Sequence, residues 1–320
     1  MRRVLCFGEA LVDFLNTGRQ NDGQLSLNNF TQYPGGAPAN AAVAVAKLGG
    51  SAVLAGQVGN DQFGRFLLQS LQLYGVDTSF VAIHPEAPTA LAFVFLDDNG
   101  ERSFSFRRRG TADIVFSKEQ VDSEWFDGEP VVHFCSNTLT DNRIAAVTDH
   151  VVTAARGANA VVSFDVNLRH SLWPDGQANA VQINDLVARA DIVKFSRDEL
   201  EYLCNGDSNG YLRACFNERV IVALVTDGPN DLEICTASTR RTIAPPAVSV
   251  ADTTGGGDAF IGAVLYGLSL QADIREYLND PDALERLVRS ASKCGAIAVT
   301  RAGAFPSFPT ADDVAGFWDV

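Results

Sequence analysis

Asp252-Thr253-Thr254-Gly255-Gly256-Gly257-Asp258 joins a three-glycine turn to an acid and runs directly into the apolar stretch 259–265, which is typical of a buried helix. Glycines at the start of a helix leave backbone N–H groups uncovered, and the helix dipole adds partial positive charge there. The turn therefore predicts a phosphate site. Asp258 at the same place indicates a base that takes a proton from a hydroxyl about to attack phosphorus. The alternative is a plain glycine-rich turn in which Asp258 only helps to start the helix.

The composition is that of a soluble globular enzyme with a sizeable core, since 46% of the 320 residues are apolar and 20% are charged. This length allows one large α/β domain or two smaller ones. The net charge of −14 argues against a nucleic-acid partner, because no broad basic field is available to hold phosphate backbones. The one tight basic run, Arg107-Arg108-Arg109, is alternatively a solvated strand end.

The sequence predicts neither a disulfide framework, nor a zinc site, nor a membrane anchor. The six cysteines lie scattered without a C-x-x-C pair and are typical of free buried thiols. The N-terminus carries basic residues, as a signal peptide does, but Glu9 and Asp13 interrupt its apolar run too early. No uncharged apolar segment is long enough to span a bilayer. We therefore expect a cytoplasmic protein with no membrane partner.

Strand-like and helix-like segments alternate along most of the chain. Small apolar residues over 39–48 stop at Gly49-Gly50, as a packed helix does, and 62–74 is a second helix-like stretch. Such alternation predicts a mostly parallel sheet with helices on both faces. The predicted strands cover residues 4–7, 51–58, 131–135, 160–165, 192–195 and 220–226, with a small hairpin over 232–235 and 240–243.

Two early regions, residues 9–34 and about 84–115, break this rhythm. The first contains Asn16-Thr17-Gly18 and Asn21-Asp22-Gly23, which are turn signals between short strands. The second holds two strands around the turn Asp97-Asp98-Asn99-Gly100. We expect the two regions to form a separate small sheet that covers a cleft. The chain is thus predicted to be one domain, residues 1–320, with a discontinuous β lid from these regions.

A second glycine cluster, Gly35-Gly36-Ala37-Pro38-Ala39-Asn40, precedes the first helix. Paired glycines permit close approach of the backbone to a ligand, and the Asn40 amide both donates and accepts hydrogen bonds. Asp13 adds a carboxylate that can accept from two hydroxyls at once. These groups suit a polyhydroxylated molecule better than a phosphate. Taken singly, the glycines are better explained by a tight turn and Asp13 by a surface carboxylate.

With these clusters in this order, the chain resembles the ribokinase-like (pfkB-type) carbohydrate kinase family from Gly8 to about Ser307. Gly35-Gly36-x-Pro38-x-Asn40-x-Ala42, continuing to Ala46-x-Leu48-Gly49, is similar to the family's N-terminal signature. Asp252-Thr253-x-Gly255-x-Gly257-Asp258 is similar to its C-terminal signature. The resemblance implies a three-layer αβα domain that transfers phosphate from ATP to a sugar with the help of Mg²⁺. Lid sheets in this family often pair between subunits, so a homodimer through the lid is expected as well.

The resemblance also assigns roles to the residues of both signatures. Asp258 would be the catalytic base, and the backbone amides of Gly255, Gly256 and Gly257 would form the anion hole for charge that develops on the γ-phosphate. The implied sugar contacts are Asp13, Gly35, Gly36, Asn40, Phe106, Arg107, Arg169 and Asp258.

For the nucleotide, the arginine of Asp165-x-Asn167-x-Arg169 matches one that reaches the phosphates, although a surface arginine after a strand is the alternative. Ser196-Arg197-Asp198-Glu199 matches an Asn-x-x-Glu element tied to Mg²⁺ through Glu199, and a helix cap explains it equally well. Ala291 and Cys294 would line the adenine pocket or simply pack within a helix. The implied ATP contacts are Arg169, Lys194, Glu199, Thr226, Gly228, Gly255, Gly257, Ala291 and Cys294.

Many relatives hold a potassium ion beside the anion hole, and the matching positions here are Asp252, Thr254, Ala298, Arg301, Gly303 and Ser307. Three positions depart from the family pattern. Gly256 replaces the usual alanine, which should loosen the turn by ~0.5–1 kcal/mol. Ser196 stands for asparagine and Val166 for a frequent proline. None of these departures removes a charged catalytic group.

Fructose, phosphorylated at its 6-hydroxyl, is the acceptor that the resemblance favours. The stretches similar to fructokinases are Gly8-Glu9-x-Leu11-x-Asp13, Asp165-x-Asn167-x-Arg169-x-x-Leu172-Trp173, and Phe104-x-Phe106-Arg107-Arg108 followed by Ala112-Asp113. The last of them implies that Arg107 or Arg108 reaches the sugar from the lid. The Arg-x-x-Leu-Trp ending also occurs in 2-keto-3-deoxygluconate kinases, whose carboxylated sugar would suit Arg107–Arg109. Aminoimidazole riboside kinase is a more distant alternative.

Two other classes of protein fit the sequence less well than a kinase does. A Rossmann dehydrogenase needs a G-x-G-x-x-G after the first strand, but Gly8 is followed by Glu9-Ala10-Leu11. A catalytically inactive sugar-binding regulator would keep the same fold, but the retained Asp258, Arg169 and glycine turn argue against it. The exact sugar, the nucleotide preference, the monovalent ion and the oligomeric state stay open at this level.

Overall fold

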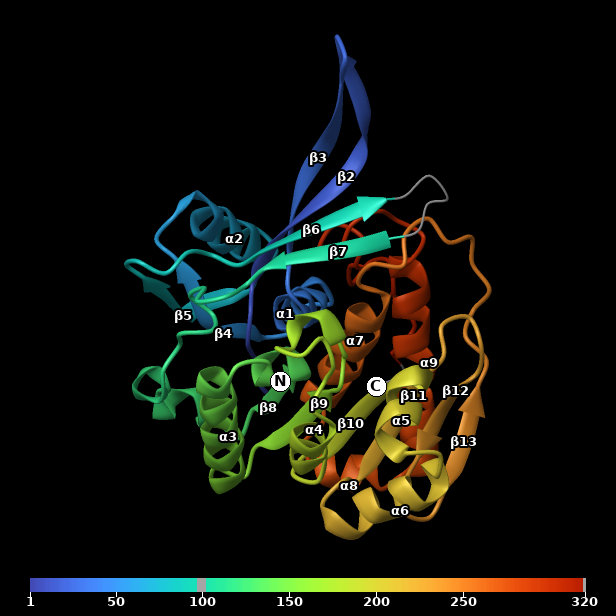
Figure 1. Cartoon of the computed structure of the whole chain (residues 1–320). Coiled ribbons are helices and arrows are strands. Elements are labelled where there is room, and N and C mark those ends of the chain that lie inside the picture. Colours follow the sequence, from blue (N-terminus) through green and yellow to red (C-terminus); the bar gives the residue numbers. More distant parts are fainter. Residues whose placement is uncertain (97–101, 319–320) are drawn as a thin grey trace.

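The computed structural model of the chain describes residues 1–96 and 102–318, so that the predicted turn Asp97-Asp98-Asn99-Gly100 lies outside the described residues. Its larger sheet has nine strands in the order β13-β12-β11-β10-β9-β8-β1-β4-β5 (Figure 1). Neighbours from β11 to β5 pair in parallel, and β12 and β13 are antiparallel. The strands are β1 Val4–Phe7, β4 Ala52–Gly59, β5 Asp77–His84, β8 Val131–Cys135, β9 Val161–Asp165, β10 Ile192–Ser196, β11 Val222–Thr226, β12 Leu232–Cys235 and β13 Arg240–Ile243.

Helices cover both faces of this sheet and give a three-layer αβα domain, as predicted. Successive side chains of a strand point to opposite faces, so Val4 and Cys6 of β1 join one core cluster whereas Leu5 and Phe7 join the other. The first face carries α1 Ala37–Lys47, α2 Gln62–Leu73, α7 Gly256–Ser269, α8 Ile274–Leu278 and α9 Pro281–Ala298. The second carries α3 Asn142–Gly157, α4 Ala180–Val187, α5 Arg197–Cys204 and α6 Ser208–Glu218.

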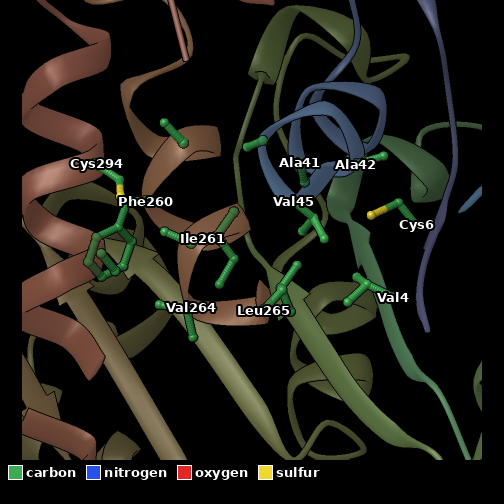
Figure 2. Packing of buried hydrophobic residues seen from close by; sticks show 14 of the residues in the cluster. Val4, Cys6, Ala41, Ala42, Val45, Phe260, Ile261, Val264, Leu265 and Cys294 are labelled. Carbon is green, nitrogen blue, oxygen red and sulfur yellow. The ribbon is translucent and has the colours of Figure 1, made fainter. Parts of the chain in front are cut away.

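Helices α1 and α7 approach each other unusually closely, because small residues face one another. A Cβ added at Gly262 would lie 2.5 Å from the Cβ of Ala44 and 3.1 Å from the carbonyl oxygen of Ala41. Only a residue without a side chain therefore permits this separation. The core around this contact contains Ala41, Ala42 and Val45 of α1 and Ile261, Val264 and Leu265 of α7 (Figure 2).

The smaller sheet has the strand order β3-β2-β6-β7 and lies over the carboxyl ends of the parallel strands (Figure 1). Two of its strands, β2 Leu11–Asp22 and β3 Leu25–Gly35, form a long hairpin, so the expected short strands over 9–34 are wrong. Asn16-Thr17-Gly18 is a bulge in β2 and not a turn, because the register shifts there and Gly18 N donates to Asn16 Oδ1 at 2.9 Å. The other two strands are β6 Leu91–Leu96 and β7 Arg102–Arg107.

Four short 3₁₀ helices complete the described elements, at Lys118–Gln120, Ser123–Phe126, Ser136–Leu139 and His170–Leu172. The strand β5 was not predicted, and it lies at the edge of the larger sheet with its side chains largely outside the core. Within residues 1–96 and 102–318, no helix has the length and apolar character needed to cross a membrane.

Candidate functional site

A cavity of about 470 Å³ lies between the two sheets. Its floor is formed where parallel strands end, as in other open α/β sheets: Glu9 follows β1, Asn137 follows β8, and Asp165, Ser196 and Thr226 end β9, β10 and β11. Its roof comes from the smaller sheet, through Leu11, Asp13, Leu15, Tyr33, Val94 and Phe106. The glycine turn and Asp258 form a third wall. Both signatures therefore open into the same cavity.

The two signatures meet directly through a hydrogen bond between side chains. Asn40, in the first turns of α1, donates from Nδ2 to Asp258 Oδ2 at 2.7 Å. Asn40 Oδ1 is buried and accepts from no described group. An acceptor left in this state costs free energy unless a ligand donates to it. The pair therefore fixes Asp258 in place and leaves one amide oxygen for a hydroxyl group.

The two carboxyl groups beside this contact hold their protons more tightly than usual. Burial, together with repulsion from Asp165, raises the pKa of Asp258 to about 6, against the opposing effects of Asn40, Lys194 and Arg169. Burial, together with repulsion from Asp258, raises the pKa of Asp13 to about 7, and Arg169 opposes this rise.

Glycines at the N-terminus of α1 make room for these groups. A Cβ at Gly35 would lie 2.1 Å from Asp13 Oδ2, and one at Gly36 would lie 2.5 Å from the carbonyl oxygen of Glu9. Gly36 also has a φ of 105°, which side chains disfavour. Gly36 lines the cavity, whereas Gly35 lies behind Asp13 and outside the lining. The paired glycines thus serve the close packing of backbone and carboxylate.

The C-terminal glycine turn is built on a left-handed residue. Gly255 has a φ of 76° and caps α7, and a Cβ there would lie 2.7 Å from the buried ring of Phe308. At Gly256 a Cβ would lie 2.7 Å from Val299 Cγ1. The glycine that replaces the family's alanine therefore has a steric reason in this chain. Because the first N–H groups of a helix have no partner inside it, the turn presents donors to the cavity.

Lys194 extends from β10 to the same turn, although it is buried. Its Nζ donates to both oxygens of Asp165 at 2.9 Å, and a Cβ at Gly257 would lie 3.5 Å from it. Burial lowers the pKa of Lys194, but the charges of Asp165, Glu199 and Asp258 raise it above its usual value overall. An ammonium group therefore stands beside the glycine turn, where it favours an anion.

Glu199 acts as a backbone clamp. Its Oε2 accepts from Ser196 N and its Oε1 from Leu168 N, both at 2.7 Å, while Ser196 Oγ accepts from Glu199 N at 3.2 Å. The helix-cap alternative therefore holds for Ser196 and Glu199. The clamp also holds the segment that carries Arg169, whose exposed side chain lines the cavity.

A buried charge cluster beside the cavity was not recognised from the sequence. Arg108 Nε donates to Asp113 Oδ2 at 2.6 Å, and its Nη2 lies 3.6 Å from Glu9 Oε2. Asn137 Nδ2 donates to Glu9 Oε1 at 2.9 Å. Three of these side chains, Glu9, Arg108 and Asn137, line the cavity. The stretches that resemble fructokinases contain Glu9, Arg108 and Asp113, but nothing in these stretches indicated that the three side chains would pair with one another.

Several of the predicted site residues lie elsewhere. Arg107 is exposed on β7 and outside the cavity lining, where its neighbour Arg108 is found instead. Ala291 and Cys294 are fully buried in the core on α9, where Figure 2 shows Cys294. Gly228 lies in a loop outside the lining. Gly35 and Gly256 also lie outside the lining, and the backbone N–H of Gly256 donates to the carbonyl oxygen of Thr253 at 3.4 Å. The other predicted sugar and phosphate contacts line the cavity: Asp13, Gly36, Asn40, Phe106, Arg169, Lys194, Glu199, Thr226, Gly255, Gly257 and Asp258.

The residues matched to a potassium site come from two segments that Asp252 joins. Its carboxylate accepts from Thr254 N at 2.8 Å and from Gly303 N at 3.1 Å. Asp252, Thr254 and Gly303 line the cavity, whereas Ala298, Arg301 and Ser307 do not. In the described part of the chain, no group of three or more His, Cys, Asp or Glu side chains could hold a metal ion.

Comparison with known proteins points in one direction. The model of the pfkB family carbohydrate kinases matches residues 1–311. Fructokinase-1 of Oryza sativa subsp. japonica is 37% identical over 97% of this chain and 96% of its own length. The structure of fructokinase with bound ATP from Xylella fastidiosa is 40% identical, with a TM-score of 0.92 over 98% of this chain and 97% of that one. A double mutant of Vibrio cholerae O395 fructokinase, solved with fructose, ADP and a potassium ion, is 34% identical, with a TM-score of 0.88 over 99% of this chain and 98% of its own.

Proposed function

Because the chain belongs to the pfkB family of carbohydrate kinases, we propose that it is an ATP-dependent fructokinase, a phosphotransferase with an alcohol group as acceptor. The contact between Asn40 and Asp258 carries the proposal, since it joins the hydroxyl-binding signature to the phosphate-binding one at 2.7 Å. Relatives named as fructokinases over nearly the whole chain support the choice of sugar. The 6-hydroxyl of D-fructose is the acceptor that we infer.

In this reaction Asp258 orients the hydroxyl and takes its proton as the oxygen attacks the γ-phosphate in line. The backbone N–H groups of Gly255, Gly256 and Gly257 and the ammonium of Lys194 stabilise the charge that develops on the transferred group. Asp13 and Asn40 hold the sugar hydroxyls, and the smaller sheet covers them. Exclusion of water by this sheet limits hydrolysis of ATP.

Mg²⁺ fits the site mainly as an ion bound to the phosphates of ATP. Both oxygens of Asp165 accept from Lys194, and each oxygen of Glu199 accepts from a backbone N–H, so few carboxylate ligands are free. Phosphate oxygens and water would therefore supply most ligands, and the ion would neutralise phosphate charge. Glu199 would act on it indirectly, through the segment that it clamps. The joined segments around Asp252 support a potassium site.

Activity is expected to rise with pH, whereas the stability that two carboxyl groups contribute is expected to fall with pH. Asp258 must be ionised to act as a base, so kcat/KM is expected to fall by about tenfold per pH unit below pH 6. The raised pKa values of Asp13 and Asp258 mean that the folded state keeps protons that the unfolded chain releases near 3.8. Their contribution to the free energy of unfolding is therefore complete below pH 3.8 and is lost as the pH rises through about 6 and 7.

The measurement is kcat/KM from pH 5 to 9 beside urea unfolding at the same values. Asp13→Asn serves as the comparison, because it removes one of the two raised carboxyls. A flat kcat/KM profile between pH 5 and 7 would contradict the assignment of Asp258.

Arg169→Ala is expected to raise the KM for ATP more than the KM for fructose, by roughly tenfold, because a forked donor to the phosphates is lost. Its guanidinium donates to the carbonyl oxygen of Leu168 at 2.8 Å, and its charge opposes the raised pKa values of Asp13 and Asp258. Steady-state kinetics with each substrate varied in turn makes the comparison, with the exposed Arg143→Ala as control. A larger rise in the KM for the sugar would place Arg169 at the acceptor instead.

The function is tested by the release of ADP with fructose, 2-keto-3-deoxygluconate, ribose, aminoimidazole riboside and other nucleosides, with Mg²⁺ and with or without potassium. Highest kcat/KM with fructose is the expected result. Preference for another acceptor would replace the proposed sugar, and sugar binding without release of ADP would indicate an inactive sugar-binding regulator.

We also expect a homodimer through the smaller sheet. The β2–β3 hairpin projects beyond the rest of the molecule (Figure 1), and Leu25 and Leu27 on it are 63% and 37% exposed. Phe30, Phe93 and Phe95 cluster on the same sheet. Apolar groups in such a position favour a partner surface. Sedimentation equilibrium tests the homodimer, because it measures the mass of the assembly, and the mass of a single chain would contradict it. The cytoplasmic location stays a prediction.

A further inference from the structure

Two carboxyl groups, those of Asp113 and Glu9, lie beside the Arg108 guanidinium before any ligand binds. Asp113 receives its Nε at 2.6 Å, and Glu9 lies 3.6 Å from its Nη2. The remaining nitrogen, Nη1, donates to the carbonyl oxygen of Asn137 at 2.9 Å and to Thr140 Oγ1 at 3.2 Å. The exposed fractions of Glu9, Arg108 and Asp113 are 1%, 7% and 4%. One buried guanidinium thus faces two buried carboxylates.

The members of this cluster differ in their relation to the cavity. Glu9 and Arg108 line it, whereas Asp113 lies outside the lining and approaches Arg108 from another side. Glu9 Oε2 is buried and accepts no hydrogen bond from the described residues, and the same holds for Asn137 Oδ1. Both oxygens are therefore ready to accept from hydroxyl groups of a bound sugar.

We propose that Asp113 determines which charge the acceptor sugar can carry, by neutralising Arg108 so that this wall of the cavity favours an uncharged polyhydroxyl sugar over a carboxylated one. The inference rests on the proposed kinase function and adds a residue that sets its specificity. With Asp113 ionised beside it, Arg108 offers no net positive charge to a sugar carboxylate, and the ionised form of Glu9, whose pKa burial raises, adds repulsion. Repulsion of this kind is strong where water is excluded.

The other cations of the cavity do not replace Arg108 in this role. The ammonium group of Lys194 donates hydrogen bonds to both oxygens of Asp165. Arg169 lowers the pKa values of both Asp13 and Asp258, so its charge acts on these two carboxyl groups. Discrimination against an acidic sugar therefore depends on how far Arg108 is neutralised.

Asp113→Asn tests the proposal with little change of shape. Asp113 Oδ1 accepts from Thr111 Oγ1 at 2.6 Å, and this hydroxyl lies 3.0 Å from the carbonyl oxygen of Arg108. In the variant the amide oxygen would accept from Arg108 Nε, and the amide NH₂ would donate to Thr111 Oγ1, whose proton turns to the Arg108 carbonyl. The local hydrogen bonds are thereby kept while one negative charge is removed.

The experiment compares kcat/KM for fructose and for 2-keto-3-deoxygluconate in the unaltered chain and in Asp113→Asn. We expect the unaltered chain to prefer fructose, and the variant to raise the ratio of the acidic to the neutral sugar by at least about tenfold, chiefly through the KM for the acidic sugar. Glu218→Gln is the matched control, because it removes an exposed charge at the end of α6 and should leave the ratio unchanged.

Other outcomes are equally decisive. Equal use of both sugars by the unaltered chain would overturn the inference, and so would a folded variant that loses both sugars in parallel, since that is the mark of a merely structural residue. If thermal melting shows that Asp113→Asn does not fold, Glu9→Gln removes the other carboxylate, and its ratio is judged by the same criterion. Failure of the unaltered chain to phosphorylate any sugar would instead remove the proposed function itself.

Discussion

Asp258→Asn is expected to lower kcat by at least ~10²-fold, because the amide cannot take the proton of the attacking hydroxyl. The side chain has nearly the same shape, and it lies within 2.7 Å of Asn40, so the variant is expected to fold and to bind both substrates. In the unaltered chain, the Asp258 pKa of about 6 means that most of this carboxyl group is ionised at neutral pH. The variant therefore isolates the proton transfer from binding.

Single-turnover release of ADP at saturating ATP and fructose measures this effect, and sugar binding measured by calorimetry serves as the control. Asp61→Asn is a matched variant, because Asp61 caps α2 outside the cavity and also accepts from Thr89. Near-normal turnover in Asp258→Asn would show that another group accepts the proton. Loss of sugar binding together with turnover would make Asp258 a binding residue first.

Gly255→Ala is expected to lower kcat by roughly 10²-fold as well, because the N–H donors of the anion hole would move. A side chain there meets the ring of Phe308, which is fully buried and has little room to turn, at 2.7 Å. The left-handed φ of 76° adds about 1–2 kcal/mol of strain. We therefore expect both a lower melting temperature and a loss of turnover.

Gly206→Ala separates the two effects. This glycine also has a positive φ, 90°, but a Cβ there would meet nothing within 4 Å, and it lies in the loop after α5. It should reproduce the backbone strain without any change of kcat. If Gly255→Ala were as active as Gly206→Ala, the donors of the turn would not contribute to catalysis.

The sequence was sufficient for the frame of the site because its determinants are local. Glycine clusters followed by small apolar runs predicted the starts of α1 and α7 to within three residues, and the short apolar runs predicted most parallel strands to within two residues. Strand β5 was missed because an edge strand lacks the apolar signal of a buried one, and its side chains are mostly exposed or half-buried. Asn16-Thr17-Gly18 carries a turn composition that serves equally well for a bulge.

Long-range charge pairs were beyond the reach of local patterns. Glu9, Arg108, Asp113 and Asn137 are separated by up to 128 positions, and only the pairing of strands and loops brings them together. The run Arg107–Arg109 suggested free positive charge, but the structure exposes Arg107 and Arg109 and buries Arg108 beside two carboxyl groups. Which arginine turns inward depends on the register of β7 and on the loop that follows it.

The close contact of α1 and α7 at Gly262 is expected to limit relative movement of these two helices. Asn40 lies near the N-terminus of α1 and Asp258 near that of α7, and the two side chains form a hydrogen bond. At Gly262 the two helix backbones pack so closely that no side chain fits between them. We therefore expect the two helices to move together. Sugar entry and product release would then require movement of the smaller sheet and the surrounding loops.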